Sequence, residues 1–283
     1  MKVLLTGAKG MLGTDMAAVL GQKHDVTGID IADLDITNLD DTLKFVKNIK
    51  PDVIINPAAF TQVDMCETEA DTAYRVNSIG ARNMAIAANE VNSPIIHIST
   101  DYVFDGNSKI PYTEFDTPNP QSVYGKSKLA GENYVKSMTN KYFIFRIQWL
   151  YGKNGPNFVK TILRIAKEKG RVTVVNDQIG KPTYTKDVAA AVLSFLGKGD
   201  YGTYHVTNSG IVSWYEFTAE ILKQSGLKNV ELLPCTTAEF PRPAKRPAYA
   251  PLDNYCLRLL GYAQMRPFEE ALGDYLTETG EVS

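Results

Sequence analysis

A tyrosine and a lysine four residues apart are the pair of side chains best suited to chemistry in this sequence. They lie in the stretch PQSVYGKSKLAGENYVK, residues 120–136, as Tyr124 and Lys128. Ser122 follows Pro120 where a helix would begin, and helical residues four apart lie on one face. A phenol beside an ammonium can act as an acid, but a Y-x-x-x-K pair also occurs on solvated helix surfaces. The rest of the chain decides between these interpretations.

Three glycines follow the first predicted strand, residues 2–6, and precede a helix predicted from Met11 onward. Gly7, Gly10 and Gly13 have the spacing G-x-x-G-x-x-G, a relative of the dinucleotide fingerprint G-x-G-x-x-G. Glycine permits a tight turn, a close approach of pyrophosphate and close packing of helix on strand, while the helix N-terminus favours an anion. Glycines also mark ordinary turns, but the strand–turn–helix context favours a dinucleotide site.

An aspartate ends the second predicted strand, residues 25–30, some twenty positions after the glycine turn. A carboxylate there binds the ribose hydroxyls of NAD and repels the 2′-phosphate of NADP. Asp30 therefore favours NADH, although it also suits a plain surface turn. Lys9 could receive a 2′-phosphate, so NADPH stays open. Asp35 and Ile36 lie further along the same loop, where they could flank the adenine.

Short apolar runs alternate with helical patterns over the first two thirds of the chain. Nearly continuous apolar strands separated by helices are typical of a parallel sheet covered on both faces. We therefore expect a doubly wound sheet. The predicted strands are 2–6, 25–30, 52–60, 94–100, 142–147, 171–175 and 202–208, the last of which could rejoin the first sheet. The predicted helices are 11–21, 38–49, 67–91, 122–136, 155–170, 185–199, one beginning at 213, and 268–280.

The later segments indicate a second, smaller lobe interleaved with the sheet. We predict a dinucleotide-binding domain from residues 1–147 plus about 181–208, and a substrate-binding lobe from about 148–180 plus 209–283. In the lobe, Ser213 and Glu216 form the S-x-x-E pattern of a capping box. The proline-rich run 233–254 is expected to be an ordered extended loop across a face, or else a mobile flap.

Composition excludes several classes of protein. The chain has 283 residues and a net charge of −2, so no basic field favours nucleic acid or an anionic membrane. Its apolar runs are strand-sized, and MKVLLTG begins a strand at once, so we expect a cytoplasmic protein. The scattered cysteines indicate free thiols, and the scattered histidines indicate no metal site; these are Cys66, Cys235, Cys256, His24, His97 and His205.

Together these motifs resemble one known family. STDYVFDG, YGKSKLAGE, RIQWLYG, NFVKT, NDQIGKPT and RPAYAPLD accompany the glycine turn over essentially the whole chain. They resemble the extended short-chain dehydrogenase/reductase family, and within it the dTDP-4-dehydrorhamnose reductases. The resemblance implies a Rossmann fold, NADH or NADPH as cofactor and a dTDP-sugar as partner. The implied reaction reduces the C4 ketone of dTDP-4-dehydro-L-rhamnose, which gives dTDP-L-rhamnose for cell-surface polysaccharides.

The same resemblance gives the Tyr124 helix its chemistry. Tyr124 would protonate the oxygen of the ketone as hydride arrives, and Lys128 would lower the pKa of the phenol and bond the nicotinamide ribose. Thr100, at the end of the fourth strand, would bond the carbonyl oxygen, although a hydroxyl there can also cap the strand end.

The remaining implied contacts line the cofactor and the sugar nucleotide. Trp149 suits the protein core equally well, and a lone arginine is often a solvated surface group. The expected cofactor contacts are Gly7, Gly10, Met11, Leu12, Gly13, Asp30, Asp35, Ile36, Ala58, Ala59, Thr61, Tyr124 and Lys128. The expected substrate contacts are Thr100, Asp101, Trp149, Asn157 and Arg246.

Two features of the sequence depart from the family. Some members are magnesium-bridged dimers that use several glutamates, but Asp15 and Lys186 stand at the corresponding places here. We therefore predict no metal, and a monomer or weak homodimer. RPAYAPLD has Ala250 where the family usually has serine, which leaves the exact sugar nucleotide open.

Two other functions fit the same scaffold. An epimerase or a 4,6-dehydratase would recycle tightly held NAD⁺, but dehydratases of this family carry an acid where this chain has Tyr102. A non-catalytic regulatory relative would keep the fold and lose the catalytic side chains. This sequence keeps Thr100, Tyr124 and Lys128, which favours an enzyme.

Overall fold

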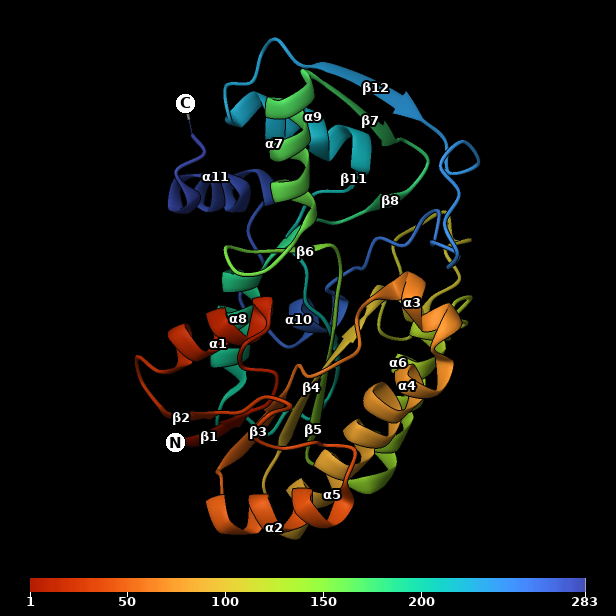
Figure 1. Cartoon of the computed structure of the whole chain (residues 1–283). Helices are drawn as coiled ribbons and strands as arrows, with labels where there is room; N and C mark the ends of the chain where they lie inside the picture. The colour runs from red at the N-terminus through yellow and green to blue at the C-terminus, as the bar shows by residue number, and fades with distance from the viewer. Residues whose placement is uncertain (283) are drawn as a thin grey trace.

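A six-stranded parallel sheet forms the centre of the protein, with the order β10-β5-β4-β3-β1-β2. The computed structural model describes residues 1–282 (Figure 1). The predicted doubly wound sheet is confirmed, and the strand predicted at 202–208 does rejoin it beside β5. The strands are β1 Lys2–Leu5, β2 Asp25–Gly28, β3 Val53–Asn56, β4 Ile95–Thr100, β5 Tyr142–Ile147 and β10 Gly202–His205.

Helices cover both faces of this sheet, as its apolar strands require. Alternate residues of a strand face opposite sides, so Val3 and Leu5 pack in one core while Leu4 packs in the other. The first core takes α1 Met11–Leu20, α8 Thr185–Phe195 and α10 Tyr255–Leu259. The second takes α2 Leu39–Ile49, α5 Ala81–Glu90 and α6 Val123–Met138.

Side-chain caps fix where several helices begin. Asn38 accepts from the backbone N–H of Asp41 at the start of α2, and Ser122 accepts from that of Gly125 at the start of α6. The predicted capping box of Ser213 and Glu216 is present at α9, Trp214–Gln224. The Ser122 cap sets the helical register that carries Tyr124 and Lys128.

The long helical region predicted at about 67–91 is present, but it is not one regular α-helix. The chain instead forms α3 Val63–Thr68, α4 Ala70–Tyr74, the π-helical turn η1 Arg75–Gly80 and then α5. The amide of Asn77, within η1, bonds the backbone of Phe60 and the hydroxyl of Ser127. These side-chain bonds give a physical reason for the widened turn, which packs directly on α6.

A smaller lobe lies beyond the carboxyl ends of the strands (Figure 1). Three helices enclose its own core: α7 Phe158–Lys169, α9 and α11 Phe268–Thr279. Sequence patterns missed its short pairs β6 Leu150–Tyr151 with β9 Thr183–Tyr184, and β8 Ile179–Gly180 with β11 Val212–Ser213. They also missed β12 Glu231–Cys235, which pairs with the predicted β7 Arg171–Val175 and ends inside the proline-rich run.

Residues 244–253 of the proline-rich run form an extended segment, which we call the strap. Its backbone bonds both parts of the molecule, through Tyr249 N to Gly106 O at 3.0 Å and Ile179 N to Ala248 O at 2.8 Å. Gly106 has φ +76°, and a Cβ there would lie 2.5 Å from Pro247. The ordered extended loop is therefore the alternative that the structure favours. Within residues 1–282, no helix is long and apolar enough to cross a membrane.

Candidate active site

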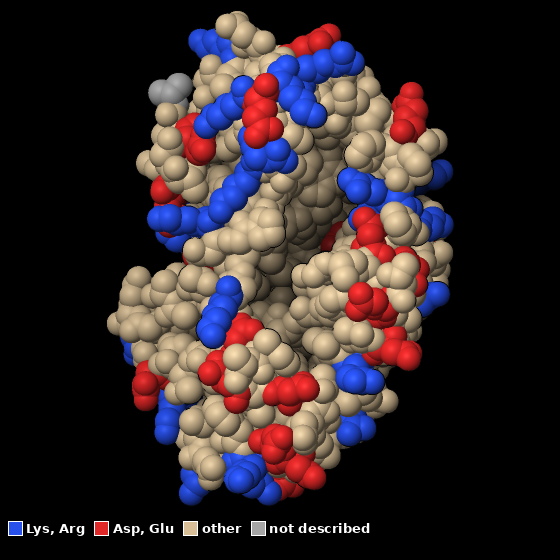
Figure 2. Space-filling model, viewed as in Figure 1, with Lys and Arg blue, Asp and Glu red and all other residues tan. Residues whose placement is uncertain are grey.

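A cleft of about 910 Å³ lies at the carboxyl ends of β1, β3, β4 and β5, where doubly wound sheets bind their ligands. The molecular surface is deeply hollowed between the sheet and the lobe, and the walls of the hollow are mostly uncharged (Figure 2). The strand ends contribute Thr6, Thr100 and Trp149 to the lining, and the lobe contributes Trp214. The cleft is therefore shared between the two parts of the chain.

Nearly every predicted site residue lines this cleft. All the expected cofactor contacts do so, as do Thr100, Asp101 and Trp149 among the expected substrate contacts. Asn157 and Arg246 are not among the lining residues. Sequence reasoning did not single out Gln148, Ser99 or Trp214, which also line the cleft.

The glycine turn forms a cradle that side chains would fill. Gly7 has φ +55°, and a Cβ there would lie 3.1 Å from the backbone of Ala58. A Cβ on Gly13 would lie 2.1 Å from the carbonyl oxygen of Gly7. Gly10 is the N-cap of α1 and offers no side chain to the first N–H groups. These groups stay available for an anion at the positive end of the helix dipole, so the turn fits a pyrophosphate.

Asp30 stands at the rim of the same half of the cleft. Its carboxylate accepts from the backbone N–H of Lys9 at 3.1 Å and from that of Ile31 at 2.9 Å. Among the residues that line the cleft, the only cationic side chains are Lys9 and Lys128. The rim therefore offers an acceptor for ribose hydroxyls and a single exposed lysine for a 2′-phosphate.

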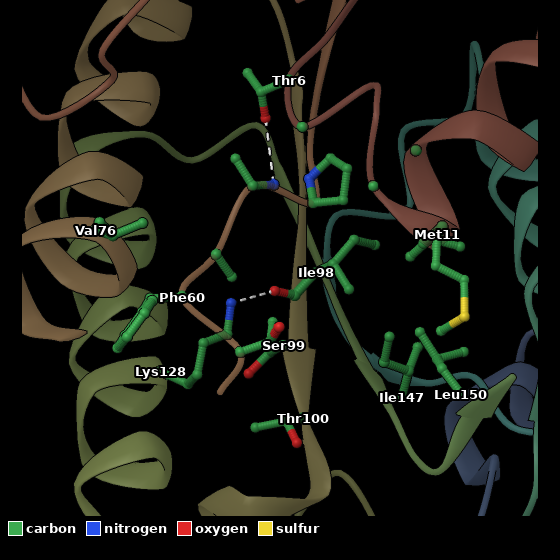
Figure 3. Close-up of a pocket in the computed structure, with 18 of the residues that line it drawn as sticks. Thr6, Met11, Phe60, Val76, Ile98, Ser99, Thr100, Lys128, Ile147 and Leu150 are labelled. Carbon is green, nitrogen blue, oxygen red and sulfur yellow. Dashed lines mark hydrogen bonds between the residues drawn. The ribbon is translucent and has the colours of Figure 1, made fainter. Parts of the chain in front are cut away.

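Lys128 is buried, with 2% of its surface exposed, and its ammonium is tied to the sheet. Nζ donates to the carbonyl oxygen of Ile98 at 2.6 Å, from α6 across to β4 (Figure 3). Burial lowers the pKa of Lys128 to about 8, and Glu132 opposes this fall. The ammonium is thus held at a fixed place in the cleft and titrates near neutral pH.

The pKa of the Tyr124 phenol in the protein by itself is raised, whereas we expected a lowered value. Burial raises the pKa of Tyr124 well above its usual value, while Thr100 opposes the rise and Asp101 adds to it. The ring of Tyr124 is 8% exposed and packs edge-on against Tyr102 at 5.4 Å. Burial therefore favours the neutral, protonated form of Tyr124, which lines the cleft.

Thr100 and Asp101 lie together at the end of β4. Oγ1 of Thr100 donates to Asp101 at 3.0 Å and accepts from the backbone N–H of Tyr102 at 3.2 Å. Thr100 thus caps the short helix η2 Asp101–Val103, and it also lines the cleft. Burial raises the pKa of Asp101 to about 6, although its bonds from Gln148 and Thr100 oppose the rise.

A buried ion pair lies one helical turn beyond Lys128. Glu132 accepts two bonds from Arg146 of β5, at 2.9 and 2.7 Å, and one from Ser99 at 2.6 Å. Burial raises the pKa of Glu132, but Arg146 and the neighbouring donors outweigh this effect and leave it below its usual value. The spacing of Lys128 and Glu132, four residues apart in YGKSKLAGE, places Glu132 on the same helical face as Lys128, but no local spacing identifies Arg146 as its partner.

Asn157 and Arg246, the two expected substrate contacts that do not line the cleft, both make hydrogen bonds within the protein. Asn157 caps α7 by accepting from the backbone N–H of Lys160 at 3.1 Å, and its amide donates to Gly152 O at 2.7 Å. Arg246, in the strap, pairs with both oxygens of Asp64 in α3. The Arg246–Asp64 pair fastens the strap to α3.

The positions that depart from the family lie in different surroundings, since Ala250 is buried and Lys186 is partly exposed. Ala250 is 1% exposed, packs with Phe104 and Leu252, and is not itself among the residues that line the cleft. Lys186 makes an ion pair with Glu278 at 2.8 Å. Within residues 1–282, no group of three or more metal-ligating side chains comes together.

The arrangement can donate one proton beside a bound dinucleotide. A neutral phenol, a buried ammonium and a threonine hydroxyl line one cleft with a pyrophosphate cradle. Reduction of a ketone needs a proton donor at the carbonyl oxygen and a fixed place for the hydride donor. The geometry therefore fits carbonyl reduction with a nicotinamide cofactor.

Comparison with known proteins gives consistent matches over the whole chain. A family model described as the RmlD substrate binding domain matches residues 1–280. A dTDP-4-dehydrorhamnose reductase from Aggregatibacter actinomycetemcomitans is 44% identical over 265 residues, covering 89% of this chain and 90% of that protein.

Two solved structures are similar over 99% of this chain and 100% of theirs, both with a TM-score of 0.96. One is a dTDP-4-dehydrorhamnose reductase from Clostridium acetobutylicum, at 49% identity. The other is a dTDP-4-dehydrorhamnose reductase from Bacillus anthracis in complex with NADP, at 45% identity.

Proposed function

The chain belongs to the dTDP-4-dehydrorhamnose reductase family, and from this premise we propose how its own residues carry out the reaction. It is an oxidoreductase that uses NADH or NADPH to reduce the C4 ketone of dTDP-4-dehydro-L-rhamnose to dTDP-L-rhamnose. The observation that carries the assignment of residues is that Thr100, Tyr124 and Lys128 line the same cleft as the glycine cradle.

Tyr124 is the proton donor. A bound nicotinamide supplies the hydride to the ketone carbon. The hydroxyl group of Tyr124 gives its proton to the carbonyl oxygen, which would otherwise become an alkoxide. Because burial keeps the phenol protonated, the acid is ready before substrate arrives.

Lys128 and Thr100 place the reacting groups. Lys128 keeps one N–H on Ile98 O, and its other N–H groups are free to bond the nicotinamide ribose and to stabilise the phenolate left on Tyr124. Thr100 bonds the carbonyl oxygen of the sugar, where its hydroxyl stabilises developing negative charge.

The cofactor lies across the glycine cradle, with its adenine end at the rim. Gly7, Gly10, Met11, Leu12 and Gly13 bind the pyrophosphate, and Asp30 binds the adenine ribose. The other proposed contacts are Asp35, Ile36, Ala58, Ala59 and Thr61, all of which line the cleft. We propose a preference for NADH, because Asp30 repels a 2′-phosphate and Lys9 is the only cationic side chain lining that end of the cleft.

The sugar nucleotide occupies the side of the cleft next to the lobe. Asp101 and Trp149 contact the sugar. Asn157 and Arg246 contact the nucleotide diphosphate, for which Arg246 would first have to leave Asp64. The mainly sheet-based parts 1–147 and about 181–208 bind the cofactor, and about 148–180 plus 209–283 bind the substrate. The chain acts in the cytoplasm as a monomer or weak homodimer, without nucleic acid.

An assay of cofactor oxidation tests the assignment. The purified protein should oxidise NADH in the presence of dTDP-4-dehydrorhamnose, and more slowly with the matching UDP and GDP sugars. NADPH is assayed beside NADH. Protein that retains bound cofactor through purification and turns over a dTDP-sugar without added NADH would instead be an epimerase or dehydratase.

A further inference from the structure

Trp149 has an unfavourable backbone conformation at the wall of the cleft. Its φ is +44°, in the left-handed region, which a bulky residue adopts only when its surroundings force it. Strained backbone of this kind clusters at functional sites. The contacts around Trp149 explain how this conformation is held, and its place in the cleft indicates what the conformation does.

Contacts on both sides of Trp149 hold the strained turn in place. The side chain of Gln148 donates to Asp101 at 2.8 Å and to Ala250 O at 2.9 Å, and accepts from the N–H of Lys181 at 2.9 Å. The carbonyl oxygen of Trp149 accepts from the N–H of Thr183 at 3.1 Å. These bonds tie the turn to η2, the strap and the β8–β9 segment.

Gly180 gives the indole of Trp149 its space. A Cβ on Gly180 would lie 2.5 Å from Cε2 of Trp149, so any larger residue would collide with the ring. Gly180 belongs to β8, which pairs with β11, and Trp214 follows β11 directly. The same short sheet therefore makes room for one indole and positions the other.

The two indoles stack face to face. The ring centroids of Trp149 and Trp214 are 3.6 Å apart, with the planes at 12°. Aromatic pairs usually prefer centroid separations of about 4.5–7 Å in offset or edge-on arrangements. Phe158 packs on Trp214 at 4.3 Å and supports it from within the lobe. The stack thus joins the end of β5 to α9 of the lobe, and both rings line the cleft.

We propose that Trp214 is a positioning residue, which holds the indole of Trp149 where it contacts the sugar ring of the substrate. This inference rests on the proposed function of the cleft. Trp214 acts through Trp149: without the stack, the strained turn at Trp149 loses this aromatic contact and the indole can leave the wall. Sugar placement then depends on the lobe, although the proton donor Tyr124 lies on α6, a helix that packs on the sheet.

The composition of the chain makes this stack directly observable. Trp149 and Trp214 are its only two tryptophans. An exciton couplet between stacked indoles in the far-ultraviolet circular dichroism spectrum can therefore arise only from this pair. The wild-type protein should show the couplet, and it should persist when NAD⁺ and dTDP-rhamnose are both bound. A couplet that disappears in that complex would overturn the proposal, because the stack would then be absent when the sugar is in place.

Trp214→Phe is the kinetic test, with Tyr215→Phe as its matched control on the next residue of α9. Trp214→Phe should abolish the couplet and raise KM for the sugar nucleotide by about tenfold or more, with KM for NADH unchanged. Tyr215→Phe should keep the couplet and both KM values. Trp214→Leu should raise the sugar KM further than Trp214→Phe, since an aromatic ring partly restores the stack.

The outcomes separate this inference from the proposed function. If the wild-type protein reduces no nucleotide sugar, the proposed function fails. If the wild type is active and Trp214→Phe keeps the wild-type KM for the sugar, only the role of Trp214 fails. A purely structural role would lower the melting temperature and raise both KM values together, which would also overturn the proposal.

Discussion

In the cofactor half of the cleft the contacts come mainly from backbone atoms of one short turn, whereas in the catalytic half they come from side chains of several distant segments. The cofactor half comprises the glycine cradle, residues 7–13, and the rim, residues 30–36. The catalytic half comprises Thr100, Asp101, Tyr124, Lys128, Gln148, Trp149 and Trp214. The first needs space and free N–H groups, and the second needs charged and polar groups held at fixed positions.

This difference has a consequence for stability. Three glycines suffice for the cradle, which brings no buried charge with it. The catalytic half places an ammonium, a carboxyl group and a phenol in a largely buried site, and it rests on the Glu132–Arg146 pair beneath. Substitutions in the cofactor half should therefore do harm by filling space that the cofactor needs. Substitutions in the catalytic half should do harm by leaving a buried charge without its partner.

Removing the charge of Glu132 should have the largest effect. Glu132→Gln leaves the guanidinium of Arg146 buried without a counter-charge, which costs on the order of 3–5 kcal/mol of unfolding free energy. Urea denaturation measures this loss. Lys136→Gln is the control, because Lys136 contacts Glu132 at 3.6 Å from a partly exposed position and should cost less than about 1 kcal/mol. Equal losses for the two variants would contradict this account.

A methyl group in the glycine cradle should come next. Gly13→Ala places a Cβ 2.1 Å from the carbonyl oxygen of Gly7, so the turn must shift. The affinity for NADH should fall by about tenfold, because a loss of about 1.4 kcal/mol in binding free energy raises the Kd tenfold. A fluorescence titration of NADH gives the Kd. Gly199→Ala is the control, because a Cβ there would meet no atom within 4 Å, and it should bind NADH like the parent. A parent-like Kd for Gly13→Ala would contradict the proposal that the glycine turn binds the cofactor.

The charge of Lys128 should set an alkaline limit to activity. Its pKa is lowered to about 8 by burial, so the side chain is charged below that pH and loses its proton as the pH rises through it. kcat/KM should therefore fall about tenfold per pH unit above that point. In Lys128→Arg this alkaline fall in kcat/KM should disappear, because a guanidinium keeps its charge. The variant should nevertheless have a lower kcat/KM than the parent. A profile that is flat up to pH 10 in the parent would show that this charge is not needed.

The smallest effect is expected at the rim. Asp30→Asn removes the charge that opposes a 2′-phosphate, so the preference for NADH over NADPH should fall by about fivefold, the factor for roughly 1 kcal/mol at an exposed site. Lys9→Met should act in the opposite direction by weakening NADPH. The ratio of kcat/KM values for the two cofactors measures both changes. An unchanged ratio in Asp30→Asn would remove the physical basis for an NADH preference.

The cofactor half was also the half that the sequence predicted best. Gly7, Gly10, Gly13 and Asp30 lie within one strand–turn–helix–strand unit, so their positions follow from local structure. The register of Tyr124 and Lys128 was equally predictable, because both lie in one capped helix. Such sites need few long-range contacts to be recognised.

The parts that escaped prediction depend on contacts between distant segments. Trp214 reaches the cleft through the β8–β11 pair, whose strands are only two residues long and leave no periodic signal. Gln148 is identified only by its bonds to Asp101, Lys181 and Ala250. The raised pKa of Tyr124 was also missed, since burial outweighs a helical neighbour and burial is a property of the whole fold.

The role of Tyr124 is the central claim, and single-turnover kinetics of Tyr124→Phe tests it most directly. The variant should bind NADH with the parent Kd, because its ring and the cradle remain. Its rate of NADH oxidation with dTDP-4-dehydrorhamnose should fall by about 10²–10⁴-fold, the range for loss of a positioned acid. A variant that oxidises bound NADH as fast as the parent would show that the proton comes from another group.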